Sequence, residues 1–208
     1  MGFSDDLRVR NSETWTAAIS HKFVTELWAG RVPEPVMSTY LSQDYLFVDT
    51  FVALMGAAVS HSDSASARMK IARQLGLVAN DEDSYFVRAL KRLNAPPASP
   101  LPPTQEFIDL MNAARADYAS ALTVLLVAEW LYLDWATPSP TPAVPQDWLY
   151  TEWIDLHRGD GFERWVELLK DELDRVAATA DDETKRRIED MFARAVRLEL
   201  AFFQATYP

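Results

Sequence analysis

The helical spacing of apolar residues is the feature that most limits what this chain can fold into. Apolar side chains recur every three or four residues through most of the sequence. Alternating runs bounded by turn dipeptides, which would indicate strands, are missing. The pattern is typical of amphipathic helices that bury one face. The sequence therefore predicts an all-α protein with about eight or nine helices.

Glycine and proline positions divide the chain into helical segments. Gly30 ends a first helix that begins near residue 12, because glycine commonly follows a helix C-terminus. Pro33 begins a long helix that runs to about residue 60, since proline is tolerated in the first turn. Further helices are expected over residues 64–77, 81–93, 104–115, 117–136, 146–157, 161–176 and 181–207.

Two proline-rich segments interrupt the helices, at residues 94–103 and 138–145. Proline removes a backbone donor and excludes regular helix, so both segments are expected to be irregular. The first is only about ten residues long, and the helical stripes on either side look incomplete alone, so we interpret it as a surface loop. Residues 1–208 are therefore expected to form a single domain.

Three of the expected helices carry one carboxylate on an otherwise apolar face. Asp44 lies on the stripe of Tyr40, Phe47 and Phe51, at the spacing i, i+4, i+7, i+11. Two further stripes repeat the pattern, with Glu129 among Tyr118, Leu122, Leu125 and Tyr132, and with Glu199 among Ile188, Phe192, Ala195 and Phe202. A buried charge without partners costs roughly several kcal/mol, so each of these acids requires partners or a function.

If the three stripes face inward, Asp44, Glu129 and Glu199 converge in a mostly apolar, aromatic cavity. Such a composition is typical of a pocket for a flat polar ring, with acids available for hydrogen bonding or general acid/base catalysis. The structural alternative stays open. Each carboxylate could lie at the edge of its stripe or pair with an arginine such as Arg194 or Arg197, and the aromatic stripes could be core alone.

Composition excludes several partners. The net charge of −11 repels phosphate backbones and anionic lipid surfaces, so neither a nucleic acid nor a membrane partner is expected. The chain has no cysteine, which excludes a disulfide and a thiol nucleophile and fits a cytoplasmic location. The N-terminal residues lack the apolar core of a signal peptide.

Metal and cofactor motifs are also missing. A di-iron bundle needs Glu-x-x-His on two helices, but Ala18, Ala58 and Ile154 stand three residues before the three histidines. The spacing leaves His21 or His61 open as a haem ligand. Walker, dinucleotide-binding and Gly-x-Ser-x-Gly motifs have no counterpart. We expect no metal and no cofactor.

Several blocks of the sequence resemble the TenA (thiaminase II) family. They are His21–Phe23 with Gly30, Tyr40–Tyr45 with Phe51, Glu129–Tyr132, Tyr150–Ile154 with Phe162, and Glu199–Phe203 with Ala205–Tyr207. In this order they extend over nearly the whole chain. The resemblance implies a haem-oxygenase-like helical bundle and a homo-oligomer, either dimer or tetramer. It also implies metal-independent hydrolysis of aminopyrimidines derived from thiamin.

The resemblance also implies roles for individual residues. Asp44 matches the acid that hydrogen-bonds the aminopyrimidine, and Glu199 matches the family's acid/base glutamate. Tyr132 matches a pocket tyrosine, and Phe47 lies where an aromatic residue packs on the ring. The remaining residues expected to bind substrate are Tyr40, Tyr150 and Trp153.

The sequence departs from the family at the nucleophile. Members with thiaminase activity have a cysteine just before the pocket tyrosine, and its place falls here at Ala128 or, with a one-residue shift, at Glu129. The chain therefore resembles the cysteine-less branch, in which we expect Glu129 to activate water or to assist. His157 stands where a tyrosine is common, and Phe107 lies near a tyrosine of other members.

The predicted function is hydrolysis of an aminomethyl- or formylaminomethyl-pyrimidine in thiamin salvage, with Glu199 and Glu129 as catalytic residues. One alternative is a non-catalytic protein on the same fold that binds a pyrimidine or another small ligand or has a regulatory role. Another is a haem-oxygenase-like enzyme with a different small substrate. Release of ammonia from candidate aminopyrimidines would distinguish them.

Overall fold

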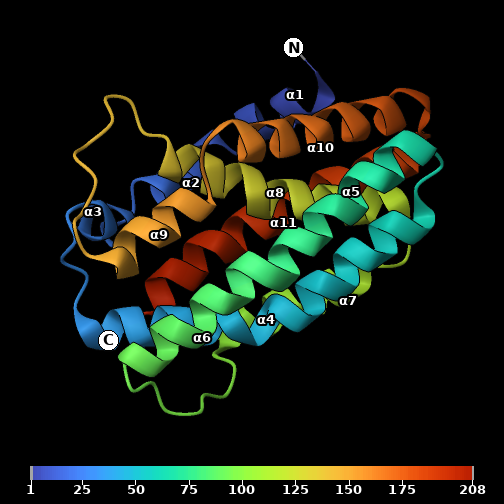
Figure 1. Cartoon of the computed structure of the whole chain (residues 1–208). Coiled ribbons are helices and arrows are strands. Elements are labelled where there is room, and N and C mark those ends of the chain that lie inside the picture. Colours follow the sequence, from blue (N-terminus) through green and yellow to red (C-terminus); the bar gives the residue numbers. More distant parts are fainter. Residues whose placement is uncertain (1, 208) are drawn as a thin grey trace.

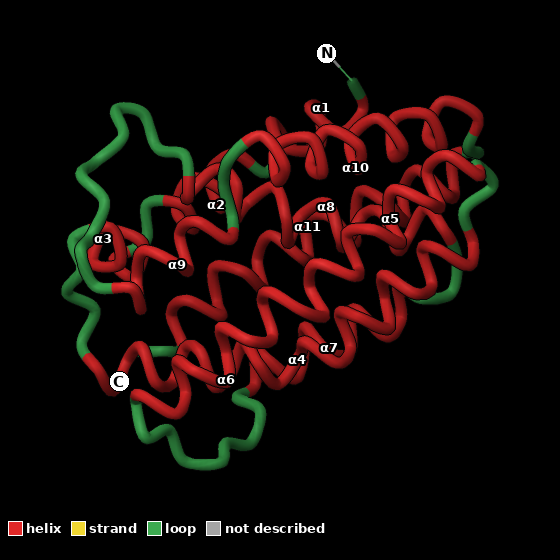
Figure 2. The backbone as a smooth tube through the Cα atoms, in the orientation of Figure 1, coloured by secondary structure: helices red, strands yellow, loops and turns green. Residues whose placement is uncertain are grey.

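A computed structural model describes residues 2–207, which form eleven α-helices and one π-helical turn (Figure 1 and Figure 2). The elements are α1 (Phe3–Arg10), α2 (Ser12–Ile19), α3 (Lys22–Trp28), α4 (Glu34–His61), α5 (Ala65–Leu77), η1 (Val78–Glu82), α6 (Asp83–Arg92), α7 (Pro102–Ala114), α8 (Tyr118–Ala136), α9 (Trp148–Leu156), α10 (Asp160–Thr179) and α11 (Asp182–Ala205). These residues contain no strand, which confirms the all-α prediction.

Helix α8 lies at the centre of the bundle. It packs against α2, α4, α7, α10 and α11, and most of its side chains are buried. A helix that is apolar on all sides needs neighbours on all sides. By length and composition α8 could cross a membrane, but 78% of the relevant window is buried inside the bundle. Its apolar composition therefore reflects its place in the core.

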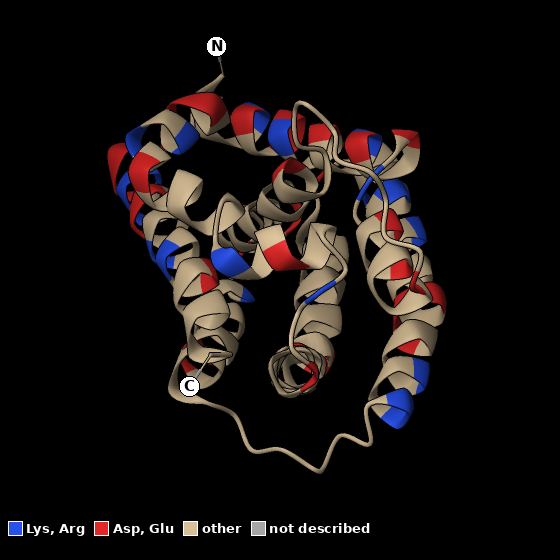
Figure 3. Ribbon diagram, turned by 90° about the vertical axis from the view of Figure 1, so that its left-hand side faces the viewer, with Lys and Arg blue, Asp and Glu red and all other residues tan. Residues whose placement is uncertain are grey.

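Charged residues lie mostly on the outward faces of the helices, as the blue and red segments in Figure 3 show. The buried apolar side chains form one continuous cluster that includes residues from α1 to α11. Because so few charges enter this interior, the acids that do enter it stand out as candidates for a site.

The N-terminal region differs from the expectation of one helix between residues 12 and 30. His21 adopts an extended conformation, with φ −57° and ψ 151°, and its side chain accepts a hydrogen bond from the Phe23 amide at 3.2 Å. This cap divides the segment into α2 and α3. The predicted stop at Gly30 is confirmed, because its φ of +61° lies in the left-handed region that favours glycine.

Helix α1 was not predicted, since few of its residues are apolar and only Ser4 and Leu7 are buried. Polar contacts hold it against the bundle. The Ser4 amide donates to Asp174 Oδ1 at 2.7 Å, and Arg8 pairs with Asp134 at 2.6 Å. Tertiary contacts, which a local pattern does not reveal, therefore determine where this helix lies.

Residues 94–101 and 138–145 are irregular, as predicted, whereas Pro102 and Pro103 form the first turn of α7. The first is fastened to α4 by Gln43, whose side chain donates to the Ser99 carbonyl at 3.0 Å and accepts from the Leu101 amide at 2.7 Å. Gln43 precedes Asp44, so this loop is fixed to the helical turn that carries the first candidate acid.

Where a break was expected between α5 and the next helix, the backbone is continuously helical. From Leu77 through Asp83 the cap residues keep right-handed helical angles, and η1 joins α5 directly to α6. A π-helical turn holds about one more residue than an α-helical turn, and such turns occur frequently at functional sites.

Candidate functional site

The candidate site is a narrow pocket enclosed by α4, η1, α7, α8, α9 and α11. The three carboxylates that the stripes single out all line it, with Asp44 from α4, Glu129 from α8 and Glu199 from α11. The chain thus brings together three acids that are far apart in the sequence.

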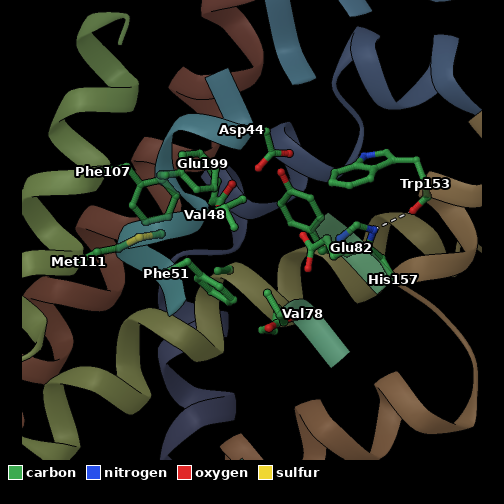
Figure 4. Close-up of a pocket in the computed structure, with 14 residues that line it drawn as sticks. Asp44, Val48, Phe51, Val78, Glu82, Phe107, Met111, Trp153, His157 and Glu199 are labelled. Carbon is green, nitrogen blue, oxygen red and sulfur yellow. Dashed lines mark hydrogen bonds between the residues drawn. The ribbon is translucent and has the colours of Figure 1, made fainter. Parts of the chain in front are cut away.

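The walls of the pocket are mostly aromatic and apolar. Figure 4 shows Phe51, Phe107 and Met111 on one side of the view, with Trp153 and His157 on the other. The remaining apolar and aromatic lining residues are Phe47, Val48, Val78, Ala128 and Tyr132. Flat side chains around a small cavity suit an aromatic ring, and the acids supply the polar contacts.

Asp44 has an oxygen available to a ligand. The residue is 4% exposed, and its Oδ2 atom has no hydrogen-bond partner among the described residues. Burial raises the pKa of Asp44 well above its usual value, the charge of Glu82 raises it further, and the nearby Tyr40 hydroxyl partly opposes this. A buried acceptor without a donor is costly, so a ligand N–H placed here would gain a strong hydrogen bond.

Glu129 and Glu199 differ in their surroundings. Burial raises the pKa of Glu129 to about 8, while the neighbouring Trp165 indole acts in the opposite direction. The Trp165 N–H approaches this carboxyl without completing a hydrogen bond. Burial raises the pKa of Glu199 well above its usual value, and the charges of Asp44 and Glu129 add to the effect. Glu129, with a pKa of about 8, is mostly protonated at neutral pH, and the upward shift of Glu199 favours its protonated form as well.

Glu82 is a fourth acid in the pocket that the sequence analysis missed. It lies at the end of η1, it is partly exposed, and burial raises its pKa to about 7. The run Asp81–Asp83 resembles an ordinary acidic helix start, which concealed it. Glu82 nevertheless stands on the stripe of Val78, Tyr85 and Phe86, so the criterion that found the other three acids would have found it as well.

His157 lines the pocket as a neutral side chain. It is 6% exposed, and its Nδ1 atom lies 2.7 Å from the Trp153 carbonyl oxygen, the dashed line in Figure 4. Burial lowers the pKa of His157 to about 4, so at neutral pH the ring carries no charge. The pocket lining therefore contains acids but no cationic side chain.

The predicted binding residues separate into three groups. Phe47, Tyr132 and Trp153 line the pocket. Tyr40 lies behind the wall, where its hydroxyl pairs with the Tyr132 hydroxyl at 2.9 Å and accepts from Trp153 Nε1 at 3.2 Å. The structure does not bring Tyr150 to the pocket, because its hydroxyl donates to the Val32 carbonyl at 3.1 Å.

The alternative reading of the acids as edge residues or arginine partners is wrong for this structure. Asp44, Glu129 and Glu199 are all buried, and none forms an ion pair with a described residue. Within residues 2–207, no group of three or more potential ligands has the arrangement that would hold a metal ion.

The bundle and its acidic, aromatic pocket define a haem-oxygenase-like helical protein. A solved domain of unknown function with that fold, from Shewanella denitrificans, covers 98% of this chain and 91% of its own, with a TM-score of 0.72 and 12% identity. The predicted fold class is thus confirmed. More narrowly, the chain belongs to the TENA/THI-4/PQQC family, whose model matches residues 9–208.

Two individual relatives match this chain over nearly their whole length. An aminopyrimidine aminohydrolase of Halalkalibacterium halodurans is 23% identical over 217 aligned residues, covering 100% of this chain and 96% of the relative. The structure of a TenA homologue from Pyrococcus furiosus superposes with a TM-score of 0.89 at 18% identity, covering 99% of this chain and 100% of the other. The family resemblance seen in the sequence is confirmed.

Proposed function

We propose that this protein is a hydrolase of thiamin salvage that cleaves the C–N bond of an aminomethylpyrimidine without a cysteine nucleophile. Membership of the family and the relative named aminopyrimidine aminohydrolase support a hydrolase of this type. The observation that carries the proposal is the pocket itself, in which a free oxygen of Asp44 and two buried glutamates with raised pKa values lie among aromatic walls.

In this proposal Asp44 orients the ring. Its free Oδ2 atom accepts a hydrogen bond from the amino group on the pyrimidine, while Phe47 and Tyr132 contact the faces or edges of the ring. An acceptor in a buried site discriminates strongly, because a ring without the amino group would leave Asp44 without a donor.

The two glutamates divide the proton transfers. Glu129, whose pKa of about 8 leaves a fraction of it ionised near neutral pH, accepts in that ionised form a proton from water as the water oxygen bonds to the methylene carbon. The C–N bond breaks with its electron pair on nitrogen, and Glu199 gives its proton to the departing ammonia. The balance is R–CH2–NH3⁺ + H2O → R–CH2–OH + NH4⁺. Return of the proton from Glu129 to Glu199, directly or through water, completes the cycle.

The absence of a thiol restricts the chemistry. The sequence contains no cysteine, and Ala128 and Glu129 line the pocket at the place where family members with thiaminase activity carry one. Covalent displacement of the thiazole of thiamin by a thiolate is therefore not available here. Attack of water on a smaller aminomethyl or formylaminomethyl derivative requires only acids of the kind that line the pocket.

The test is turnover by the wild-type protein and by Glu199→Gln. The aminomethylpyrimidine that corresponds to the pyrimidine half of thiamin, and its N-formyl derivative, are incubated with each protein, and released ammonia and formate are measured. Gln keeps the size of Glu199 but holds no transferable proton, so turnover should fall about 10²–10⁴-fold. Glu167→Gln, an exposed position on α10, is the control and should keep full activity.

Two outcomes would contradict the proposal. Undiminished turnover in a well-folded Glu199→Gln variant would remove Glu199 from the mechanism. Binding of both pyrimidines without release of ammonia or formate by the wild-type protein would support the non-catalytic alternative instead.

A further inference from the structure

Glu82 lies where the pocket opens to the surface. Beside the pocket is an outer groove, a surface hollow of about 230 Å³ between α5, η1 and the α9–α10 junction. Glu82, Glu129, Val78 and His157 line both the pocket and the groove. The two spaces are therefore adjacent, and a group that leaves the pocket on this side passes Glu82.

Among residues 2–207, no cationic side chain pairs with Glu82. It forms no hydrogen bond or ion pair with another described side chain in either space. Arg158 is the cation of the outer groove, and its Nε atom donates to Asp155 at 2.8 Å. His157, the other basic group nearby, is neutral. A partly buried carboxylate without a partner pairs favourably with a positive group that a ligand supplies.

A second observation also indicates a ligand that brings hydrogen-bond donors to the acids of the pocket. The buried Asp44 Oδ2 atom also lacks a donor, so the pocket offers acceptors at both Asp44 and Glu82. A metal ion is a poor candidate for their partner, because the described acids and histidines do not gather into a set of three ligands. An organic cation with two N–H donor groups satisfies Asp44 and Glu82 together.

We propose that Glu82 is a further substrate-binding residue, whose carboxylate pairs with the ammonium group of the amine substrate at the junction of the pocket and the outer groove. This inference rests on the proposed function and adds the residue that recognises the reacting nitrogen. A primary aliphatic amine is protonated at neutral pH, so the substrate arrives with a positive charge that can pair with the Glu82 carboxylate.

The π-helical turn directs only one of three consecutive acids into the pocket. Asp81 is exposed and lines the outer groove alone, whereas Asp83 accepts a hydrogen bond from the Tyr45 hydroxyl at 3.1 Å. The chain therefore supplies its own matched control, because Asp81 carries the same charge one residue away.

The same pairing explains how substrate and product are distinguished. The reaction replaces –NH3⁺ by –OH on an unchanged ring, so the alcohol cannot form the ion pair with Glu82. The ammonium ion is released beside this carboxylate and beside the outer groove, which also contains Asp81 and Asp155. Glu82 thus strengthens binding of the substrate and favours departure of the neutral product.

Binding measurements test this without turnover. Titration calorimetry at pH 7.5 compares the aminomethylpyrimidine and its hydroxymethyl counterpart in a Glu199→Gln background, in which hydrolysis of the amine should be slow. Adding Glu82→Gln should weaken binding of the amine about tenfold or more. Binding of the alcohol should change by no more than about twofold. Adding Asp81→Asn should change neither affinity.

Several results would overturn the inference. An equal loss of affinity for both ligands would show that Glu82 has a structural role. Unchanged affinities would show that Glu82 does not contribute to binding. Loss of the amine's affinity in Asp81→Asn as well would indicate a general field effect. Absence of turnover by the wild-type protein would refute the proposed function alone, since the comparison of the two affinities would still test Glu82. Binding of neither ligand would refute both.

Discussion

Replacing Glu129 by Gln should stabilise the protein at alkaline pH and leave its stability unchanged at acid pH. Glu129 is 7% exposed, and burial raises its pKa from 4.5 to about 8. Between these two values the unfolded chain has lost a proton that the folded protein keeps, so folding becomes less favourable as the pH rises. Below about pH 4.5 the carboxyl is protonated in both states, and its effect disappears.

The magnitude follows from the difference between the two pKa values. A rise from 4.5 to about 8, at about 1.4 kcal/mol for each pKa unit, corresponds to about 5 kcal/mol of unfolding free energy above pH 8. For a chain of 208 residues, 1 kcal/mol changes the melting temperature by about 2–4 °C. Glu129→Gln should therefore raise the melting temperature by roughly 10–20 °C at pH 8.5 and by about 0 °C at pH 4.5.

Scanning calorimetry at pH 4.5, 7 and 8.5 measures this difference, with Glu167→Gln as a control for an exposed acid. The control should give the same melting temperature as the wild-type protein at each pH. A lower melting temperature for Glu129→Gln at pH 8.5 would refute the reasoning, because it would show that the ionised carboxyl has stabilising partners. A gain of equal size at pH 4.5 would also refute it, since improved packing rather than removal of a charge would be the cause.

Four further outcomes are expected. Asp44→Ala should weaken binding of the aminopyrimidine by about 1.5–3 kcal/mol in titration calorimetry, because it removes the acceptor for the ring amino group, and unchanged affinity would exclude this contact. Asp134→Ala should lower the melting temperature by several °C while turnover stays normal, since Arg8 and the Trp15 indole lose their shared acceptor, and equal stability would contradict that reading. Elemental analysis should find no stoichiometric iron or zinc, and one metal per chain that is lost together with activity on chelation would oppose the mechanism. Light scattering should give a mass above 23.6 kDa, the mass of one chain, with the 37% exposed Trp148 at the contact, and a mass of 23.6 kDa at micromolar concentration would oppose assembly.

The sequence predicted most of the fold because the longer helices bury regular apolar stripes. The ends of α4 and α8 agree with the expectation to within one or two residues, since Pro33 and Asp117 are local signals. The parts that it missed depend on contacts between distant residues. Helix α1 is fixed by Asp174 and Asp134, which lie more than 120 positions away in the sequence.

The candidate site was predicted to a similar extent. Asp44, Glu129 and Glu199 break apolar stripes, and that conflict between residue type and position is visible without a structure. The place of Tyr150 could not be predicted from the sequence, because a helix such as α9 has two buried faces and only one of them faces the pocket. Tyr150 and Trp153 both pack within their own chain, so neither is left exposed for contact with another subunit.

The turn between α5 and α6 makes the number of residues as important as their identity. Successive residues of an α-helix are rotated by about 100°, so shortening Val78–Glu82 by one residue would turn its acids about the helix axis while the helix itself continued. A relative with a shorter turn could then keep the sequence Asp-Glu-Asp and yet have no carboxylate that faces the pocket. Another relative could have such a carboxylate although its acid aligns with a different position of this chain. Alignments of this segment should therefore count residues between Ile71 and Tyr85, two side chains that are fully buried and so fix the rotation of the helices on either side.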